Sequence, residues 1–186
     1  TADAEPGAFE FSPDGVYLAF SKVSNGGVYT VSSNDITPER RTIFGQFRFW
    51  EDAHTFIFVD YTPAGQSYRQ NINSGRPEGL PIPDIDPAGD EIDLLFGKIP
   101  GTTLAYGHRG YVSSRTQAER YVTMNLVSGR SSIGSQGVHS PRLVNNNQML
   151  YRLLTEQGPL MLQGIQPETG ELYGAAREVP LEYAVS

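Results

Sequence analysis

Histidine is the residue of this 186-residue chain to consider first for chemistry, because a serine or threonine nucleophile needs a base beside it. The chain has His54, His108 and His139, and no two of them have the i, i+4 or strand-alternate spacing of a zinc site. It has no cysteine, which excludes thiol catalysis, thiolate metal sites and disulfides. The spacing therefore predicts no catalytic residue and no metal ligand.

Glycine-containing segments that hold a nucleophile or a phosphate are also missing. The sequence contains no Gly-x-Ser-x-Gly elbow, no Ser-x-x-Lys and no Gly-rich phosphate loop. The nearest segments, 131–134 and 134–137, are more typical of a glycine-spaced turn. Because a catalytic site needs several residues in mutually placed roles, we predict that the chain is not an enzyme and uses no cofactor.

One acidic segment, 84–93, has oxygen ligands at alternate positions before a glycine, as a calcium loop does. Its fifth position is Ala88 and its twelfth is Leu95, where a calcium loop needs a bidentate glutamate. We therefore expect these carboxylates to face basic residues of the same surface, a pairing worth little when exposed. Calcium binding is the alternative, and an unchanged melting temperature in a chelator would exclude it.

A long connection from Gly107 to about Ala118 carries basic and aromatic residues. The equivalent connection after the first hairpin, 23–27, is about half as long. Recognition residues tend to lie on long connections that a rigid scaffold supports, although many such connections are tolerated insertions. The sequence thus predicts a partner-binding face made of His108, Arg109, Tyr111 and Arg115.

These residues must be positioned by strands, and the strands come in a repeat. Residues 9–20 read as an alternating strand, a Pro-Asp-Gly turn and a second alternating strand, which is a β-hairpin. Residues 49–58 lie over 11–20 without gaps, and looser copies stand at 102–106 and 145–151. In the second copy Trp50, the only tryptophan, replaces Ser12. We expect Trp50 to pack against a neighbouring segment, with an interface anchor as the alternative role.

A third strand ending in a glycine turn follows each hairpin, and a less regular fourth strand can be placed after it. The fourth strands are expected near 41–44, 79–82, 131–134 and 176–183. The 186 residues then divide into four units of about 46, close to the length of a propeller blade. The expected organisation is one domain, 1–186, with approximate blades 1–45, 46–90, 91–138 and 139–186.

The segment Phe11-Ser12-Pro13-Asp14-Gly15, followed by Leu18-Ala19-Phe20 and later Val28-Tyr29, resembles the repeat of TolB-type, WD40-like β-propellers. That repeat also occurs in the propellers of prolyl-oligopeptidase-like peptidases and in periplasmic sensor parts of membrane-anchored winged-helix regulators. The resemblance implies an all-β fold, a β-propeller of about four four-stranded blades, either a small closed ring or part of a larger propeller. It does not choose among the functions that propellers carry.

Stacked blades bury the sheet faces that a single blade would expose. The large apolar side chains expected between blades are those of Phe11, Phe20, Phe49, Phe58, Leu104 and Tyr106. A β-sandwich core is the alternative interpretation of the same residues.

The composition limits the partners. The net charge is −7, and 14 scattered Lys and Arg residues do not form the basic cluster that nucleic-acid binding needs. No apolar run approaches the roughly 20 residues that span a bilayer, so we expect no direct membrane insertion.

Together these features predict a non-enzymatic module for protein interaction or ligand sensing. By resemblance it is periplasmic, as part of an envelope protein or a signalling and transcriptional regulator. Its partner would be another protein or another domain of the same chain, and an oligomer is compatible with the sequence. The alternative is the substrate-gating propeller of a prolyl-oligopeptidase-like serine peptidase, without its catalytic domain. A third hypothesis is a small-ligand or glycan binder that uses the central channel.

Overall fold

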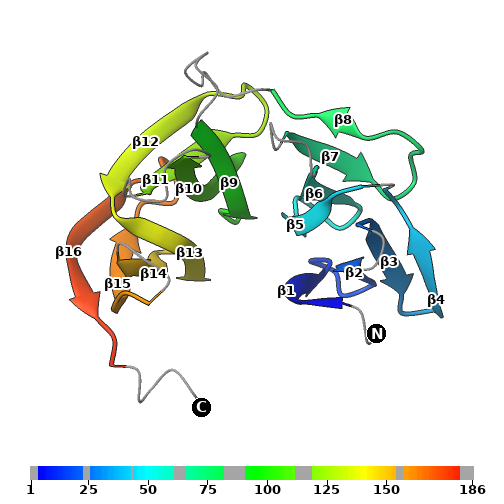
Figure 1. Ribbon diagram of the computed structural model, residues 1–186, viewed down its shortest axis with the longest axis horizontal. Helices are drawn as coiled ribbons and strands as arrows, with labels where there is room; N and C mark the ends of the chain where they lie inside the picture. Colours follow the sequence, from blue (N-terminus) through cyan, green and yellow to red (C-terminus); the bar gives the residue numbers. More distant parts are fainter. Residues whose placement is uncertain are drawn as a thin grey trace. The chain divides into compact units, whose positions relative to one another are not determined.

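The computed structural model describes residues 4–22, 26–42, 44–60, 66–81, 91–111, 119–153 and 157–180. All regular secondary structure in these ranges is β-strand, and the ranges contain no helix that could cross a membrane. The strands form four four-stranded sheets in which consecutive strands pair antiparallel. This is the blade architecture of a β-propeller, and it confirms the predicted all-β fold class (Figure 1).

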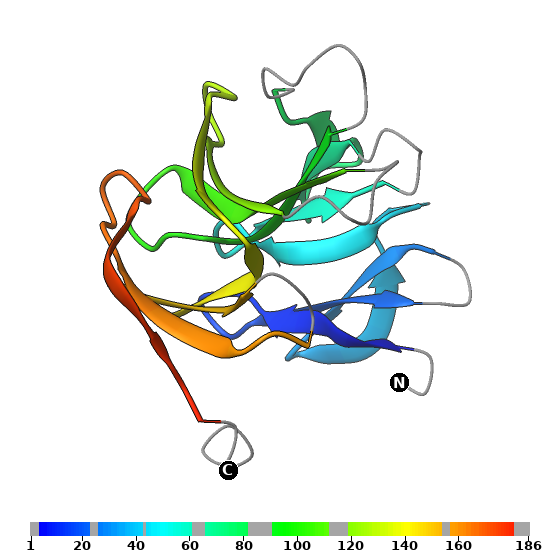
Figure 2. The same cartoon turned by 60° about the vertical axis from the view of Figure 1, so that its left-hand side comes forward.

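The chain divides into two compact units, Thr1–Ile82 and Pro83–Ser186, and each unit holds two blades. In the first unit, blade 1 consists of β1 (Ala4–Phe11), β2 (Tyr17–Lys22), β3 (Val28–Ser32) and β4 (Asp35–Arg40), and blade 2 of β5 (Gln46–Trp50), β6 (Thr55–Val59), β7 (Ser67–Asn71) and β8 (Glu78–Gly79). In the second unit, blade 3 consists of β9 (Glu91–Lys98), β10 (Leu104–Tyr111), β11 (Arg120–Asn125) and β12 (Ser131–Gln136), and blade 4 of β13 (Val138–Asn145), β14 (Gln148–Leu153), β15 (Leu160–Ile165) and β16 (Leu172–Glu178). Figure 2 shows the same sheets from a second direction.

The repeated turn aspartate has a structural role that explains why it recurs. Between β1 and β2, the Asp14 carboxylate accepts hydrogen bonds from the Ser12 hydroxyl at 2.6 Å and from the Val16 N–H at 3.1 Å. These bonds lower the pKa of Asp14, the Ser12 bond contributing most. Between β5 and β6, Asp52 accepts in the same way from the backbone N–H groups of His54 and Thr55, both at 2.8 Å.

The core of the first unit lies between blades 1 and 2 and is mostly aromatic. Blade 1 contributes Ala19 and Val28, and blade 2 contributes Phe47, Trp50, Phe56, Phe58 and Ile72. The Trp50 indole Nε1–H donates to the Glu10 carbonyl at 3.0 Å, which fixes β5 against β1. Trp50 is buried, in agreement with its expected packing role.

The core of the second unit lies between blades 3 and 4 and mixes aliphatic and phenolic side chains. Its members are Ile99, Tyr106, Tyr121, Val138, Met149, Tyr151 and Ile165. Of the residues expected between blades, Phe20, Phe49, Phe58 and Tyr106 are buried and Leu104 is half-buried.

Phe11 differs from this expectation, because its side chain is 63% exposed. It pairs with Leu18, whose side chain alternates with the Ala19 side chain of the core. Successive side chains of a strand point to opposite faces. Phe11 therefore lies on the face of blade 1 that does not pack on blade 2.

Two of the outermost strands lie several residues from their expected positions, whereas β12, at Ser131–Gln136, agrees with the expected 131–134. The structure places β4 at Asp35–Arg40 instead of 41–44, and β16 at Leu172–Glu178 instead of 176–183. The described side chains of both strands are largely exposed. A strand that is exposed on both faces needs no apolar alternation, so the pattern that locates a half-buried strand is missing.

Candidate functional site

Two strands of different blades in the second unit bring two histidines together. His108 lies on β10 of blade 3, His139 lies on β13 of blade 4, and Glu119 directly precedes β11. His108 pairs with Tyr121 across β10 and β11, so the register puts Glu119 diagonally across from His108 on the same face. The sheet register thus places a carboxylate between two imidazoles.

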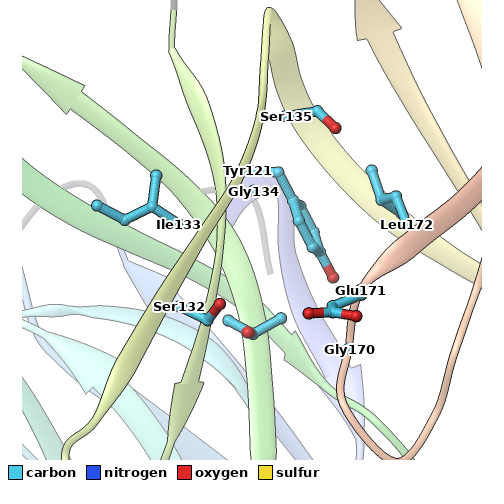
Figure 3. Close-up of a pocket in the computed structure, with 9 residues that line it drawn as sticks. Tyr121, Ser132, Ile133, Gly134, Ser135, Gly170, Glu171 and Leu172 are labelled. Atoms are coloured by element: carbon cyan, nitrogen blue, oxygen red, sulfur yellow. The ribbon is translucent and has the colours of Figure 1, made fainter.

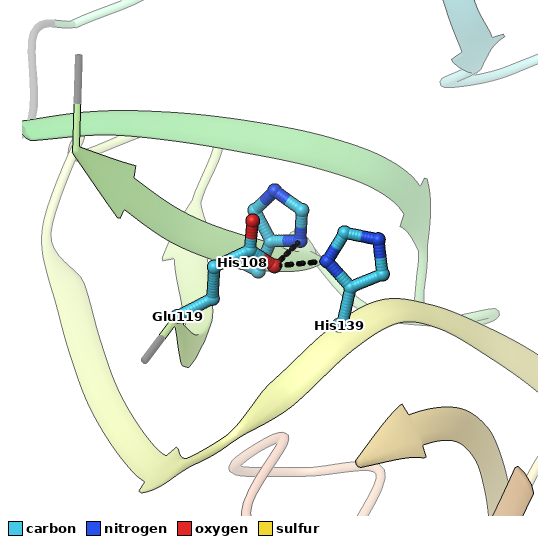
Figure 4. A group of neighbouring side chains, drawn as sticks. All are labelled: His108, Glu119 and His139. Carbon is cyan, nitrogen blue, oxygen red and sulfur yellow. Dashed lines mark hydrogen bonds and ion pairs between the residues drawn. The ribbon is translucent and has the colours of Figure 1, made fainter. Parts of the chain in front are cut away.

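The Glu119 carboxylate contacts both rings through a single oxygen. The distance from its Oε2 to His108 Nδ1 is 3.0 Å, and Oε2 also forms a short hydrogen bond with His139 Nδ1 (Figure 4). One ligand atom from each of the three residues lies within 4.8 Å of the other two. These residues are the metal-ligating candidates within the described ranges, and we call them the His–Glu–His cluster.

The β13 strand is irregular directly after His139. The register of β13 against β14 shifts between His139 and Arg142, as at a β-bulge. Between them Ser140 has a φ of 46°, and it is the one non-glycine residue of the described ranges with a positive φ. Its backbone N–H donates to His108 Nδ1 at 3.4 Å.

Aromatic contacts hold the His108 ring in place. The Phe96 ring meets it edge-on, with 5.0 Å between centroids, and the His139 ring stacks on it at 5.3 Å. The Arg142 guanidinium lies 4.9 Å from the centroid of Phe96 and covers that ring in turn. His108 is only 3% exposed, whereas Glu119 and His139 are half-buried.

A separate small pocket of about 230 Å³ lies between β11, β12 and the β15–β16 turn. Tyr121 and Glu171 are among its lining residues, and the Tyr121 ring is directed toward the turn that carries Glu171 (Figure 3). Within the described ranges the buried Tyr121 hydroxyl has no hydrogen-bond partner. Burial raises the pKa of Tyr121 far above its ordinary value.

The structure separates the residues predicted for the partner-binding face. His108 and Arg109 are buried, and His108 belongs to the cluster. Tyr111 ends β10, but its side chain and all of Arg115 lie outside the described residues. The partner-binding role stays a prediction. The acidic segment 84–93 also lies outside the described residues, because the structure does not describe residues 82–90 or the side chains of 91–93.

The cluster differs from the expectation that the three histidines stand apart. His108 and His139 are 31 residues apart and belong to different blades, so no local spacing rule connects them. Glu119 was not singled out, because a lone glutamate before a strand carries no motif. His54 belongs to the first unit, where it is exposed in a turn with its ring edge-on to Tyr17 at 6.1 Å.

No family model matches the sequence, and no curated protein matches it. Several solved structures match it in fold. A protein of Agrobacterium tumefaciens described as TolB is 15% identical with a TM-score of 0.67, over 92% of this chain and 63% of that one. A regucalcin of the same organism, described as calcium-binding, is 8% identical with a TM-score of 0.63, over 92% and 57%.

A puromycin-hydrolyzing peptidase of Mycobacterium tuberculosis is 15% identical with a TM-score of 0.61, over 92% of this chain and 29% of that one. At these identities the similarities show the fold, a propeller like that of TolB, and not the function. The chain spans less than two thirds of the length of each of these three proteins.

Proposed function

We propose that this chain is a non-enzymatic β-propeller module that binds another protein through an exposed apolar face of blade 1. The observation that carries the proposal is the exposure of two phenylalanines on β1. Phe9 is 59% exposed and Phe11 is 63% exposed. Glu10 lies between them, and its carboxylate accepts a hydrogen bond from the Trp50 N–H of blade 2 at 3.3 Å. Because successive side chains of a strand alternate, the two phenylalanines point to the face opposite blade 2.

This face has the properties of a contact surface. Strand β1 is at the edge of its sheet, with β2 as its one strand neighbour within the described ranges. An edge strand with large exposed apolar side chains favours association, and soluble proteins cover such edges. A partner that buries both phenylalanine rings would remove their remaining exposed surface from water, which is worth about 1–2 kcal/mol for each ring because about 60% of each is exposed.

A periplasmic location, in an envelope complex or as the sensor part of a regulator, belongs to the same proposal. The support is the similarity to TolB-type propellers in the repeat and in the fold. The structural relatives include a peptidase as well as TolB, so the fold alone does not decide between enzyme and binding module.

The experiment places a photo-crosslinking amino acid at position 11 in the cells that produce the protein. Position 37, on the exposed outer strand β4 of the same blade, is the matched control. We expect one defined protein adduct at position 11 and none at position 37. Equal labelling at both positions, or no adduct at position 11, would contradict the proposal. Turnover of aryl esters, peptide anilides or lactones by the purified chain would contradict its non-enzymatic part.

The similarity to the M. tuberculosis peptidase favours one other candidate, the substrate-gating propeller of a serine peptidase. A serine-hydrolase domain encoded beside this segment in the same gene would support it. An upstream membrane helix with a winged-helix domain would support the sensor role instead.

A further inference from the structure

We propose that His108, Glu119 and His139 bind a divalent transition-metal ion, for which Zn²⁺ has the best-matching chemistry. This inference is independent of the protein-binding role, because the cluster lies in the second unit and the exposed phenylalanines lie in the first.

The donor atoms select the class of metal. Two imidazole nitrogens and one carboxylate oxygen form the donor set of many zinc sites and of other first-row metal sites. Calcium and magnesium take oxygen ligands almost throughout, so a site with two nitrogens discriminates against them. Three protein ligands leave at least one position of a tetrahedral ion for water or another ligand.

The distances are close to those that a metal requires. Ligands at 2.0–2.1 Å from a tetrahedral zinc ion lie about 3.3 Å from one another. Glu119 Oε2 is 3.0 Å from His108 Nδ1, and all three ligand atoms lie within 4.8 Å. Closing separations of up to 4.8 Å to about 3.3 Å requires movements of up to about 1.5 Å, which the half-buried side chains of Glu119 and His139 would make.

The hydrogen bond from Ser140 gives a second reason to expect a cation. A His108 Nδ1 that accepts the Ser140 N–H is unprotonated and leaves its proton on Nε2; a metal ion on Nδ1 would use the same single lone pair and replace this long hydrogen bond. The unprotonated Nδ1 also lies 3.0 Å from a carboxylate oxygen. Two electron-rich atoms at this distance repel each other, and a bound cation relieves the repulsion.

The surrounding structure restricts the positions of the ligand side chains. His108 and His139 lie on strands, and Phe96 fixes the His108 ring. The positive φ of Ser140 costs about 1–2 kcal/mol of folding free energy. Strained backbone of this kind is concentrated at functional sites. Because the ligands come from blades 3 and 4, the ion would join two sheets of the second unit.

The test is zinc binding by the whole chain, measured by calorimetry and by thermal unfolding with and without Zn²⁺. We expect one equivalent to bind and the melting temperature to rise, because an ion that binds the folded state stabilises it. The variants E119Q and H139Q should lower the affinity at least about tenfold. Tetrahedral Co²⁺ in the same site should give visible absorption bands that both variants lose.

H54A is the matched control, since His54 is the histidine outside the cluster, and it should bind zinc as the unmodified protein does. An excess of Ca²⁺ or Mg²⁺ should not displace the ion. Cooperative thermal unfolding of each variant in EDTA shows that the variant is folded without the metal ion. E119Q and H139Q each remove one ligand, so the loss of zinc affinity is tested twice. Absence of saturable zinc binding, equal loss in H54A, or full binding by both E119Q and H139Q would overturn the proposal.

Discussion

The two units build the same pair of blades but fill the space between the blades differently. Between blades 1 and 2 the core is dominated by aromatic rings, among them Phe47, Trp50 and Phe56, whose centroids lie 5.7–6.2 Å apart. Between blades 3 and 4 the apolar core is joined by the His–Glu–His cluster and by the buried Tyr121 hydroxyl. Burying polar groups costs free energy unless they are paired. The first unit also buries polar side chains, such as Gln70, but within the described ranges it is the second unit that brings two imidazoles and a carboxylate together.

The largest expected effect is the loss of an aromatic ring from the first unit. Phe56→Ala removes a fully buried ring from the core and should lower the free energy of unfolding by about 3–5 kcal/mol, measured by urea denaturation. Met149→Ala, at a fully buried position of the second core, should cost about 2–5 kcal/mol. Phe44→Ala is the exposed control, with an expected change below about 0.5 kcal/mol. If Phe56→Ala behaves like Phe44→Ala, the aromatic core is not what stabilises the first unit.

Alanine substitutions in the hairpin turns should lower the free energy of unfolding equally in the two units. Gly15 and Gly101 have φ values of 74° and 75°, and an added Cβ would meet no atom within 4 Å at either position. Substitution by alanine should therefore cost only backbone strain, about 1–2 kcal/mol in each case. Gly75 is equally open without a positive φ, and Gly75→Ala should change the unfolding free energy by less than about 1 kcal/mol. Unequal losses at Gly15 and Gly101 would show that the units differ in their turns as well as in their cores.

Alkaline pH should weaken the second unit through Tyr121. Because burial raises the pKa of Tyr121 in the folded state, its stabilising contribution is complete below the ordinary value of 10.0 and is lost as the pH rises above it. The loss is about 1.4 kcal/mol for each pH unit between the unfolded and folded pKa values. Urea unfolding at about pH 9 and about pH 11 should show a smaller alkaline loss in Tyr121→Phe than in the unmodified protein. An identical loss in both would mean that Tyr121 is not shielded from solvent.

The smallest expected changes in unfolding free energy are those of two tyrosine-to-phenylalanine substitutions in the second core at neutral pH. The Tyr106 hydroxyl accepts a hydrogen bond from the Leu143 N–H at 3.2 Å, so Tyr106→Phe should cost about 1 kcal/mol. The Tyr121 hydroxyl has no such partner within the described ranges, so Tyr121→Phe should be close to neutral or slightly stabilising. A clear loss in Tyr121→Phe would show that its hydroxyl has a partner, such as a water molecule or a ligand in the adjoining pocket.

The sequence predicted the fold because the signals of the inner strands are local. The turn aspartates Asp14 and Asp52 and the apolar alternation around them lie within a dozen residues of each other, and the structure gives both aspartates the same hydrogen-bonding role. The outer strands β4 and β16 lack that alternation because water covers them, and their positions were wrong by several residues.

The candidate site could not be predicted in the same way. His108 was singled out for a long connection and proved to lie inside a strand, buried. His139 comes close to it because the first strand of blade 4 packs beside the second strand of blade 3, at a point where the register of β13 shifts after His139. Such contacts depend on how two sheets meet, which no rule on the spacing of residues contains.

Each of the four sheets is made of strands that follow one another in the chain, and among the strands that the structure describes none completes the sheet of another blade. A peptide bond cut between β8 and β9 would therefore sever no ladder of backbone hydrogen bonds. Each half would keep its two sheets and the apolar core between them. In an architecture of this kind, whole blades can be lost, duplicated or exchanged between genes without first dismantling a sheet.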